Sequence, residues 1–297
     1  MPNPPLIIGL GEILWDMLPA GRQLGGAPAN FAYHAGVLGA RAAVVSRVGD
    51  DALGREILQR LDDLRLDRAQ VSVDDRHPTG VVDVTLDAAG VPQYVIRTGV
   101  AWDFLPHGPA LLEMAGRADA VCFGTLGQRG ADSRESIGAF LAATRRPCLR
   151  VFDINLRQHY FSRELVQAMM RTSDVLKLND QELPIVIDLL GLQAASPADA
   201  AGAIMRDFPV RLVALTRGPA GSALFQRDGQ ADDHPGFPGP VADTVGAGDA
   251  FTAALILGLL DGHPLARINV FANRLAAFVC SQNGATPVIP DALKAMR

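Results

Sequence analysis

Residues 243–251 read DTVGAGDAF and lead directly into the apolar run AFTAALILGLL, which ends at Leu260. A short polar stretch before such a run is typical of the start of a buried helix. Gly246 and Gly248 flank Ala247 and carry no side chain, so successive backbone N–H groups stay accessible there. Because free N–H groups at a helix start bind oxyanions, the stretch predicts a phosphate-binding turn.

Asp249 stands in the first turn of this expected helix. A carboxylate normally repels phosphate, so its presence beside an anion-binding turn suggests a proton acceptor for a hydroxyl that attacks the phosphate. The alternative is that Asp249 only complements the positive end of the helix dipole. The residues of this turn leave both interpretations open.

Composition limits the possible classes of protein. The chain has 297 residues, 48% of them hydrophobic and 20% charged, as expected for one large α/β domain or two smaller ones. Its formal net charge of −5 argues against a protein that binds nucleic acid through a general basic field. Disordered and fibrous classes are excluded by the same numbers.

The cysteines and the N-terminus predict a cytoplasmic protein. Cys122, Cys148 and Cys280 lack C-x-x-C spacing and stand in apolar runs, which predicts buried, reduced thiols. The first residues lack the basic and apolar regions of a signal peptide. The longest apolar stretch, residues 250–260, is too short to span a bilayer, so no membrane partner is expected.

Short β-branched runs alternate with helical patterns along most of the chain, which favours a mostly parallel sheet covered by helices on both faces. Helices are expected at 27–38 and 51–64. Strands are expected at 6–10, 42–48, 118–123, 148–154, 175–178 and 210–215.

One region departs from this alternation. The runs TGVVDVTLD and PQYVIRT lie within residues 71–104 and are separated by a turn-like Ala88-Ala89-Gly90. Their alternating apolar and polar residues predict a sheet with one wetted face. Residues 13–18 look similar. We expect a small β-sheet lid built from about residues 12–30 and 71–104, and its exposed face is where a homodimer would form.

Several common catalytic motifs are missing from the sequence. No G-x-x-x-x-G-K-[ST] phosphate loop and no H-E-x-x-H motif occurs, and the six histidines are scattered. Gly9-Leu10-Gly11 opens like a dinucleotide fingerprint, but Leu14 stands where the third glycine would be. A P-loop enzyme, a metalloprotease and a Rossmann dehydrogenase are therefore disfavoured.

DTVGAGDAF resembles the C-terminal signature of the ribokinase-like (phosphofructokinase-B type) carbohydrate kinases. GGAPAN at residues 25–30 resembles that family's N-terminal signature. Five further motifs stand in the family's order: GEILWD, SRVGDDALG, FDINLR, KLNDQE and LTRGPAG. The resemblance spans nearly the whole chain and implies a single domain over residues 1–297, a three-layer α/β sandwich with a β-lid. GEILWDMLP and LGGAPANFAYHAG are most similar to the fructokinase branch.

The resemblance implies how the phosphate site works. Asp249 is similar to the family's catalytic base, and the turn of Gly246, Ala247 and Gly248 resembles its anion hole. Asp243 and the carbonyl of Val245 resemble a monovalent-cation site. The matching segment around residue 284 is less similar, so dependence on K⁺ stays open.

The resemblance also implies a nucleotide side. Asn179 and Glu182 are similar to an N-x-x-E element that organises phosphate and Mg²⁺, although a helix capping box would use the same pair. The positions that would line the ATP pocket are Thr216, Arg217, Gly218, Gly221 and Asn273.

The sugar side is implied by Asp16, Gly26 and Asn30, whose carboxylate, bare backbone and amide suit vicinal hydroxyls. Arg97, at the end of a lid strand, is a further substrate candidate. Arg157 is a candidate for contact with phosphate. These residues belong to four separate stretches of the sequence.

The expected function is ATP-dependent, Mg²⁺-requiring phosphorylation of a sugar hydroxyl, with fructose as acceptor. Ribose, 2-keto-3-deoxygluconate and a nucleoside such as adenosine are the alternatives. A nucleoside would need an aromatic pocket, which Trp15, Phe31, Tyr94 and Trp102 could supply. A catalytically silent paralogue that only binds sugar or nucleotide is a different class, and the intact DTVGAGDAF stretch disfavours it.

Overall fold

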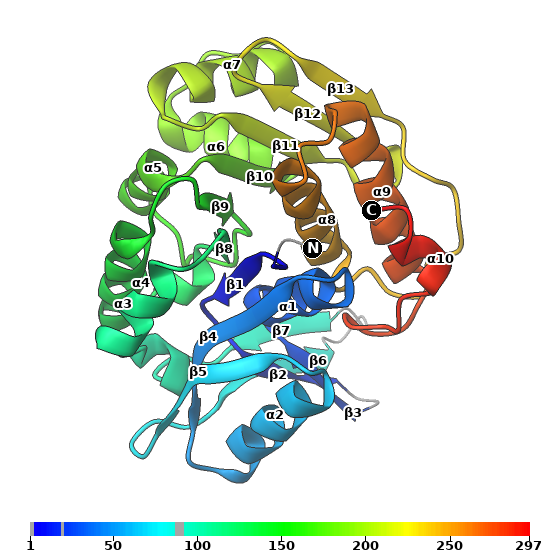
Figure 1. The fold of residues 1–297 in the computed structure, drawn as a ribbon. Helices are drawn as coiled ribbons and strands as arrows, with labels where there is room; N and C mark the ends of the chain where they lie inside the picture. The colour runs from blue at the N-terminus through cyan, green and yellow to red at the C-terminus, as the bar shows by residue number, and fades with distance from the viewer. Residues whose placement is uncertain (1–2, 19–20, 87–91) are drawn as a thin grey trace.

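The computed structural model describes residues 3–18, 21–86 and 92–297. A nine-stranded sheet has the order β13-β12-β11-β10-β9-β8-β1-β4-β5, with β1 between β8 and β4 (Figure 1). All pairs from β11 to β5 are parallel, and β12 adds antiparallel pairs with β11 and β13. The bounds are β1 Leu6–Leu10, β4 Arg41–Gly49, β5 Asp67–Asp74, β8 Ala120–Phe123, β9 Leu149–Asp153, β10 Val175–Asn179, β11 Leu212–Thr216, β12 Ser222–Gln226 and β13 Ala231–His234.

Helices cover both faces of this sheet and make three layers. One face is covered by α3 (Pro109–Ala115), α4 (Ala131–Ala143), α5 (Arg163–Thr172), α6 (Glu182–Leu190) and α7 (Pro197–Asp207). The other face is covered by α1 (Ala27–Val37), α2 (Ala52–Asp63), α8 (Ala247–Leu260), α9 (Leu265–Cys280) and the short α10 (Asp291–Lys294). Three 3₁₀ turns, Ala101–Phe104, Leu126–Gln128 and Gly218–Ala220, lie in connecting segments.

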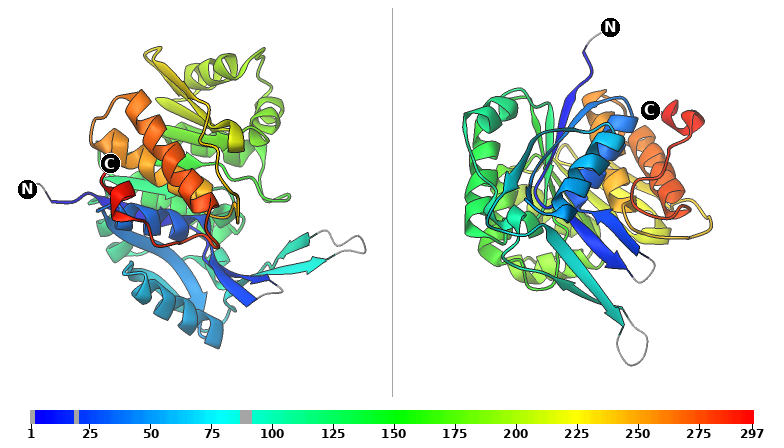
Figure 2. Two further views of the ribbon diagram at one scale, coloured as in Figure 1. Left: turned by 90° about the vertical axis from the view of Figure 1, so that its right-hand side faces the viewer. Right: turned by 90° about the horizontal axis from the view of Figure 1, so that it is seen from below.

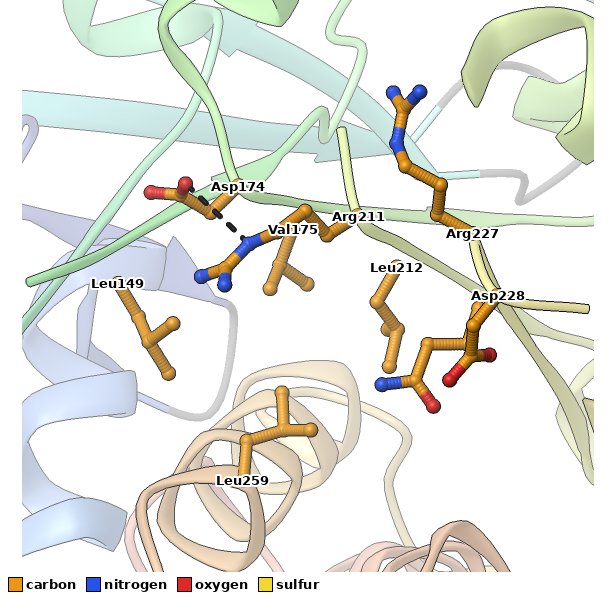
Figure 3. Close-up of a pocket in the computed structure, with 9 residues that line it drawn as sticks. Leu149, Asp174, Val175, Arg211, Leu212, Arg227, Asp228 and Leu259 are labelled. Carbon is orange, nitrogen blue, oxygen red and sulfur yellow. Dashed lines mark ion pairs between the residues drawn. The ribbon is translucent and has the colours of Figure 1, made fainter. Parts of the chain in front are cut away.

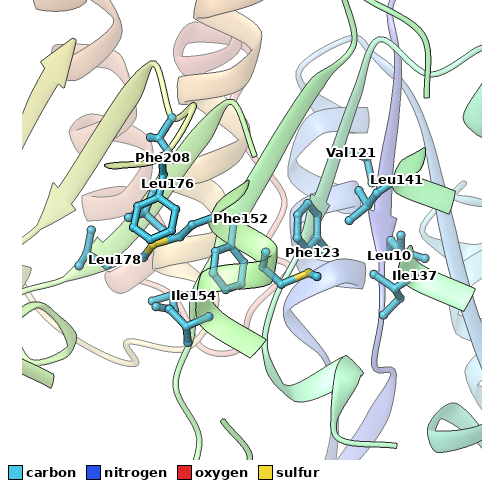
Figure 4. Close-up of a cluster of buried hydrophobic side chains, with 14 of the residues drawn as sticks. Leu10, Val121, Phe123, Ile137, Leu141, Phe152, Ile154, Leu176, Leu178 and Phe208 are labelled. Atoms are coloured by element: carbon cyan, nitrogen blue, oxygen red, sulfur yellow. The ribbon is translucent and has the colours of Figure 1, made fainter. Parts of the chain in front are cut away.

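The core follows from the alternation of side chains along the strands. In β1, Ile7 packs toward α1 and α8, whereas Ile8 packs toward α3 and α4, and both are fully buried. Phe123 and Phe152 stack on the face covered by α3 to α7, with ring centroids 5.6 Å apart (Figure 4). Aliphatic residues fill most of the remaining space, as the low aromatic content requires.

The expected main-sheet strands and both helices are confirmed, with small shifts at their ends. The helix expected at 51–64 is α2, and the carboxylate of Asp51 caps it by accepting a hydrogen bond from the N–H of Gly54 at 2.7 Å. Pro28 lies in the first turn of α1, where its missing N–H removes no helical bond.

A separate four-stranded sheet has the order β3-β2-β6-β7. Its bounds are β2 Leu14–Leu18, β3 Gly21–Gly25, β6 Gly80–Leu86 and β7 Pro92–Ile96. It projects from the main body near the start of α1, as both views in Figure 2 show. We call these four strands the small sheet.

The small sheet has narrower bounds than expected. Residues 71–74 belong to β5 and pair with β4 in the main sheet, because a half-exposed edge strand shows the same alternation as a lid strand. Residues 27–30 belong to α1, and residues 101–104 form a 3₁₀ turn. The turn expected at residues 88–90 lies outside the described residues.

Within the described ranges, no helix combines the length and apolar character needed to cross a membrane. Cys122 and Cys148 are buried and Cys280 is half-buried, and all three are free thiols. Burial raises the pKa of the Cys148 thiol to about 12.

Candidate active site

Candidate site residues from different motifs gather at one end of the main sheet. Glu12 follows β1, Asp153 ends β9, Asn179 ends β10 and Thr216 ends β11. These are the carboxyl ends of parallel strands. From β1 the chain continues to β4 and β5 on one side, whereas β8 to β11 lie on the other side, so the topological switch point falls between β1 and β8. Open α/β sheets bind ligands at such a position.

The start of α1 and the start of α8 meet over this end of the sheet. Asn30 Nδ2 donates a hydrogen bond to Asp249 Oδ2 at 2.9 Å, which joins the two signature motifs directly. Each helix begins after a glycine with positive φ, 111° at Gly26 and 79° at Gly246. Both turns therefore depend on glycine.

Asp249 is poised to take up a proton. Burial and, to a smaller extent, the nearby charge of Asp153 raise the pKa of its carboxyl group to about 6, and the hydrogen bond from Asn30 opposes the rise. A base whose pKa lies near the working pH suits proton transfer.

The turn before α8 is closely packed on both sides. A Cβ atom on Gly246 would lie 2.6 Å from the carbonyl oxygen of Ala285, so no larger residue fits there. A Cβ atom on Gly248 would lie 3.0 Å from the ammonium nitrogen of Lys177. A cation therefore stands beside the expected anion-binding turn.

Lys177 and Asp153 are site residues to which the sequence analysis gave no role. Lys177 Nζ lies 3.0 Å from Asp153 Oδ1, and both side chains are buried. Thr252 Oγ1, on α8, donates to Asp153 Oδ2 at 3.0 Å. Burial alone would lower the pKa of Lys177, but Asp153 and Glu182 outweigh burial and raise it. The available signal was a charged residue inside each apolar strand run, VFDIN and VLKLN.

Two further carboxylates share this region. Burial raises the pKa of Glu12 to about 7 and that of Asp16 to about 6. Arg157 lowers the pKa of Glu12, Asp16 and Asp249, so its positive charge acts on all three. Glu12 was not singled out from the sequence, although it stands in the GEILWD motif.

Asn179 and Glu182 form a capping box at the start of α6. Asn179 Oδ1 accepts from the N–H of Glu182 at 2.8 Å, and Glu182 Oε2 accepts from the N–H of Asn179 at 2.8 Å. Burial raises the pKa of Glu182, and Lys177 opposes that rise. Asn179 and Glu182 therefore do cap the helix, as one of the two interpretations predicted. This capping is compatible with a role in binding phosphate.

The remaining nucleotide-side candidates have structural partners of their own. Arg217 pairs with Asp233 on β13 through bonds of 2.8 and 2.9 Å, which ties residues 216–221 to the antiparallel edge of the sheet. Asn273 is buried on α9 and donates to Ser222 Oγ at 2.7 Å and to the Asn269 carbonyl at 2.8 Å.

Arg97 differs from the other sugar-side candidates. It forms a bidentate pair with Asp83 on the neighbouring strand β6, at 2.6 and 2.8 Å, and is exposed. Asp16, by contrast, lies on β2 with its carboxylate against Gly25, next to the start of α1. The structure brings Asp16, Gly26 and Asn30 together and leaves Arg97 paired elsewhere.

Asp243 bridges two loops beside the turn before α8. Its Oδ1 accepts from the N–H of Val245 at 3.0 Å, and its Oδ2 accepts from the N–H of Gly284 at 3.2 Å. Segment 284–285 therefore packs directly against the turn that is expected to bind phosphate, although its sequence matched the family pattern less closely than the rest.

A surface pocket of about 450 Å³ lies at the opposite, amino end of the strands (Figure 3). Apolar side chains of Leu149, Val175, Leu212 and Leu259 line it, with Asp174 and Arg211 at its edge. It contains none of the predicted site residues.

Comparison with known proteins agrees with this geometry. The fructokinase of Klebsiella pneumoniae is 30% identical over 95% of this chain and 95% of its own. The crystal structure of a Vibrio cholerae fructokinase, in a form with fructose, ADP and calcium ion bound, is 26% identical, has a TM-score of 0.80 and covers 99% of this chain and 98% of its own. An uncharacterised sugar kinase of Pyrococcus horikoshii has a TM-score of 0.81 at 27% identity, over 95% and 93% of the two chains.

These likenesses confirm the expected ribokinase-like fold, a mostly parallel sheet between helical layers with a small additional sheet. Residues 20–292 match the pfkB family carbohydrate kinases, which is nearly the whole chain. Both signature motifs lie within that match. The chain therefore belongs to the pfkB family of carbohydrate kinases, and its similarity to fructokinases supports the fructokinase branch.

Proposed function

We propose that this protein transfers the γ-phosphoryl group of ATP to a hydroxyl group of fructose. The bond between Asn30 and Asp249 carries the proposal, because it places the proposed sugar-binding helix start against the proposed base. The relatives support fructose as the acceptor, since a fructokinase is 30% identical and another was crystallised with fructose and ADP.

In this proposal the carboxylate of Asp249 takes the proton from the attacking sugar hydroxyl as the oxygen–phosphorus bond forms. Backbone N–H groups of Gly246, Ala247 and Gly248 then stabilise negative charge on the transferred group. Lys177 supplies a positive charge beside the same turn and is held in place by Asp153. The product is the sugar phosphate, and ADP leaves.

The sugar would lie between the small sheet and the start of α1. Asp16 and Asn30 would accept from and donate to its hydroxyls, and the backbone of Gly26 would lie against the ring. A contact from Arg97 would require it to leave its pair with Asp83. We therefore place Asp16 and Asn30 before Arg97 as sugar ligands.

Asn179, Glu182 and segment 216–221 would form the nucleotide side, with Asn273 behind it. In the described ranges, no group of three or more His, Cys, Asp or Glu side chains is placed to hold a metal ion. This fits Mg²⁺, which is commonly held by substrate phosphates, water and one or two carboxylates. When bound, Mg²⁺ would neutralise phosphate charge, and Glu182 would orient its water ligands.

Asp243 and the carbonyl of Val245 are the proposed ligands of a monovalent cation such as K⁺. The carboxylate of Asp243 already ties the loop before α8 to Gly284. A cation held there would fix the position of the phosphate-binding turn. The donors are all oxygens, which suits a hard cation.

The buried aromatic residues disfavour a nucleoside acceptor. Trp15, Phe31 and Trp102 are at most 4% exposed and pack in the core, and the Trp15 indole N–H donates to the Leu53 carbonyl. Tyr94 is 56% exposed on the small sheet. The aromatic pocket that a purine would require is therefore not formed by these four residues.

A substrate panel tests the proposal. ADP release is measured with ATP and Mg²⁺ and with fructose, ribose, 2-keto-3-deoxygluconate or adenosine as acceptor. We expect fructose to give the highest kcat/KM. A higher value for any other acceptor would overturn the fructose assignment and leave the carbohydrate kinase activity in place, whereas no turnover of any acceptor would favour a silent binding protein.

A further inference from the structure

The loop that follows β9 is conformationally strained. Of the three non-glycine residues with positive φ in the described part of the chain, two stand here, Asn155 at 43° and Gln158 at 49°. Asparagine tolerates this region of backbone space better than glutamine does. Such a conformation persists only where surrounding contacts impose it, and residues 155–160 are held at both ends.

The first end is bonded to the proposed nucleotide side. The N–H of Leu156 donates to Glu182 Oε1 at 2.9 Å, while the other oxygen of Glu182 accepts from Asn179 in the capping box. Thr125 Oγ1 donates to the carbonyls of Ile154 and Asn155 at 2.9 and 3.2 Å. The start of the loop therefore moves with the N-x-x-E element and the main body.

The second end is bonded to the small sheet. Gln158 Nε2 donates to the carbonyl of Tyr94 at 2.7 Å, and Tyr160 Oη donates to the carbonyl of Ile96 at 3.3 Å. Both carbonyls belong to β7, the edge strand of the small sheet. The guanidinium of Arg129 lies 4.8 Å from the Tyr160 ring centroid and also donates to the carbonyl of Arg97, just beyond β7.

Arg157 lies between these two attachments. Its guanidinium is exposed and donates to the neighbouring Leu156 carbonyl at 3.3 Å. Among the described residues no carboxylate forms an ion pair with it, yet its charge acts on Glu12, Asp16 and Asp249. The loop thus carries an exposed cation whose charge reaches three carboxylates of the acceptor side of the site.

We propose that residues 155–160 link the small sheet to the Glu182 side of the site, so that movement of the small sheet over the sugar shifts Arg157 and strengthens nucleotide binding. Gln158 and Tyr160 are the positioning residues in this link. Neither touches the proposed base. The inference rests on the sugar kinase function and adds a route by which the two substrates sense one another.

The linkage has a measurable consequence. If sugar binding tightens nucleotide binding through the loop, nucleotide must tighten sugar binding by the same factor, commonly about 5- to 150-fold. Breaking the bonds to β7 should reduce this factor and leave nucleotide binding to the sugar-free protein unchanged, because the Leu156–Glu182 bond remains. A residue with a merely structural role would change stability and not the factor.

The experiment measures the Kd of Mg·ADP by calorimetry, with and without saturating sugar, for the full chain and for Gln158→Ala and Tyr160→Phe. Gln59→Ala is the matched control, because Gln59 is also an exposed glutamine that donates one side-chain bond, to Asp63 at 3.0 Å. The sugar used is the acceptor that gives the highest kcat/KM in the substrate panel. A wrong fructose assignment would therefore be detected by the panel and would not affect the result of this experiment.

We expect the ratio of the two Kd values to fall by about threefold or more in each loop variant. The sugar-free Kd should stay within about twofold of the wild-type value, and Gln59→Ala should keep the wild-type ratio. The proposal is overturned if the wild-type ratio is one, or if both loop variants keep it. It is also overturned if their sugar-free Kd rises as much as the sugar-bound Kd.

Discussion

The two ends of the main sheet hold buried carboxylates in opposite electrostatic states. At the amino ends of the strands, burial alone would raise the pKa of Asp174, but Arg146 and Arg150 outweigh burial and lower it. Arg150 lies 3.1 Å from the carboxylate. Arg211 lies 3.7 Å from it, the ion pair that Figure 3 marks. At the carboxyl ends, burial prevails and raises the pKa of Asp249 to about 6.

The difference separates charges that stabilise the fold from charges that await a ligand. Asp174 is compensated by arginines and by the backbone N–H of Arg150, so it holds strand ends together. At the other end, one exposed arginine, Arg157, lowers the pKa of Glu12, Asp16 and Asp249. It does not offset burial, and the pKa of each carboxyl group stays raised. Perturbed groups of this kind are typical of catalytic sites.

Of the substitutions considered, Asp249→Asn, at the carboxyl ends of the strands, should lower catalytic activity most. Asparagine keeps the size and polarity but accepts no proton, so we expect kcat to fall about 10²- to 10⁴-fold with modest changes in KM. Steady-state kinetics and thermal unfolding should be measured together. Near-wild-type kcat with a lower Tm would instead show that Asp249 serves as a helix cap.

Gly248→Val should have the next largest effect. A side chain there would crowd the ammonium group of Lys177 and block the turn, so we expect kcat/KM to fall about 10²- to 10³-fold and the Kd of ATP to rise. Gly138→Val, on α4 with open space around its Cβ position, is the control and should keep wild-type kinetics. Equal losses in both variants would argue against an anion-binding turn.

Asp174→Asn should affect stability and not chemistry. Removing a charged acceptor that is 2% exposed should lower the free energy of unfolding by about 1–3 kcal/mol, which corresponds to a Tm lower by several degrees. We expect kcat to stay within about twofold of wild type. If kcat drops while Tm is unchanged, the distinction between the two ends of the sheet is wrong.

Much of the fold was predictable because its signals are local. The buried parallel strands are apolar runs with clear ends, and DTVGAGDAF stands where expected, at the start of α8. The boundary of the small sheet was not predictable in the same way. The alternation of β5 fits either sheet, and its pairing with β4 is a long-range choice.

Site residues that stand in a sequence motif could be predicted. Residues whose role depends on a side chain from another strand were harder to predict. The join between Asn30 and Asp249 follows from two motifs that lie 219 residues apart. The pair of Lys177 with Asp153 depends on adjacent strands, and sequence alone did not indicate it. Likewise, nothing local to Arg97 shows that Asp83 occupies its guanidinium.

The pH dependence of kcat/KM for the sugar most directly tests whether Asp249 is the base. Its raised pKa means that the ionised form is lost below about pH 6, where activity should fall roughly tenfold per pH unit. Because Asp16 titrates in the same range, Asp16→Asn is measured alongside. We predict an acid limb with an apparent pKa near 6 in wild type and Asp16→Asn, and none in the residual activity of Asp249→Asn. A limb near the ordinary aspartate value of about 4, or one that persists in Asp249→Asn, would contradict this assignment.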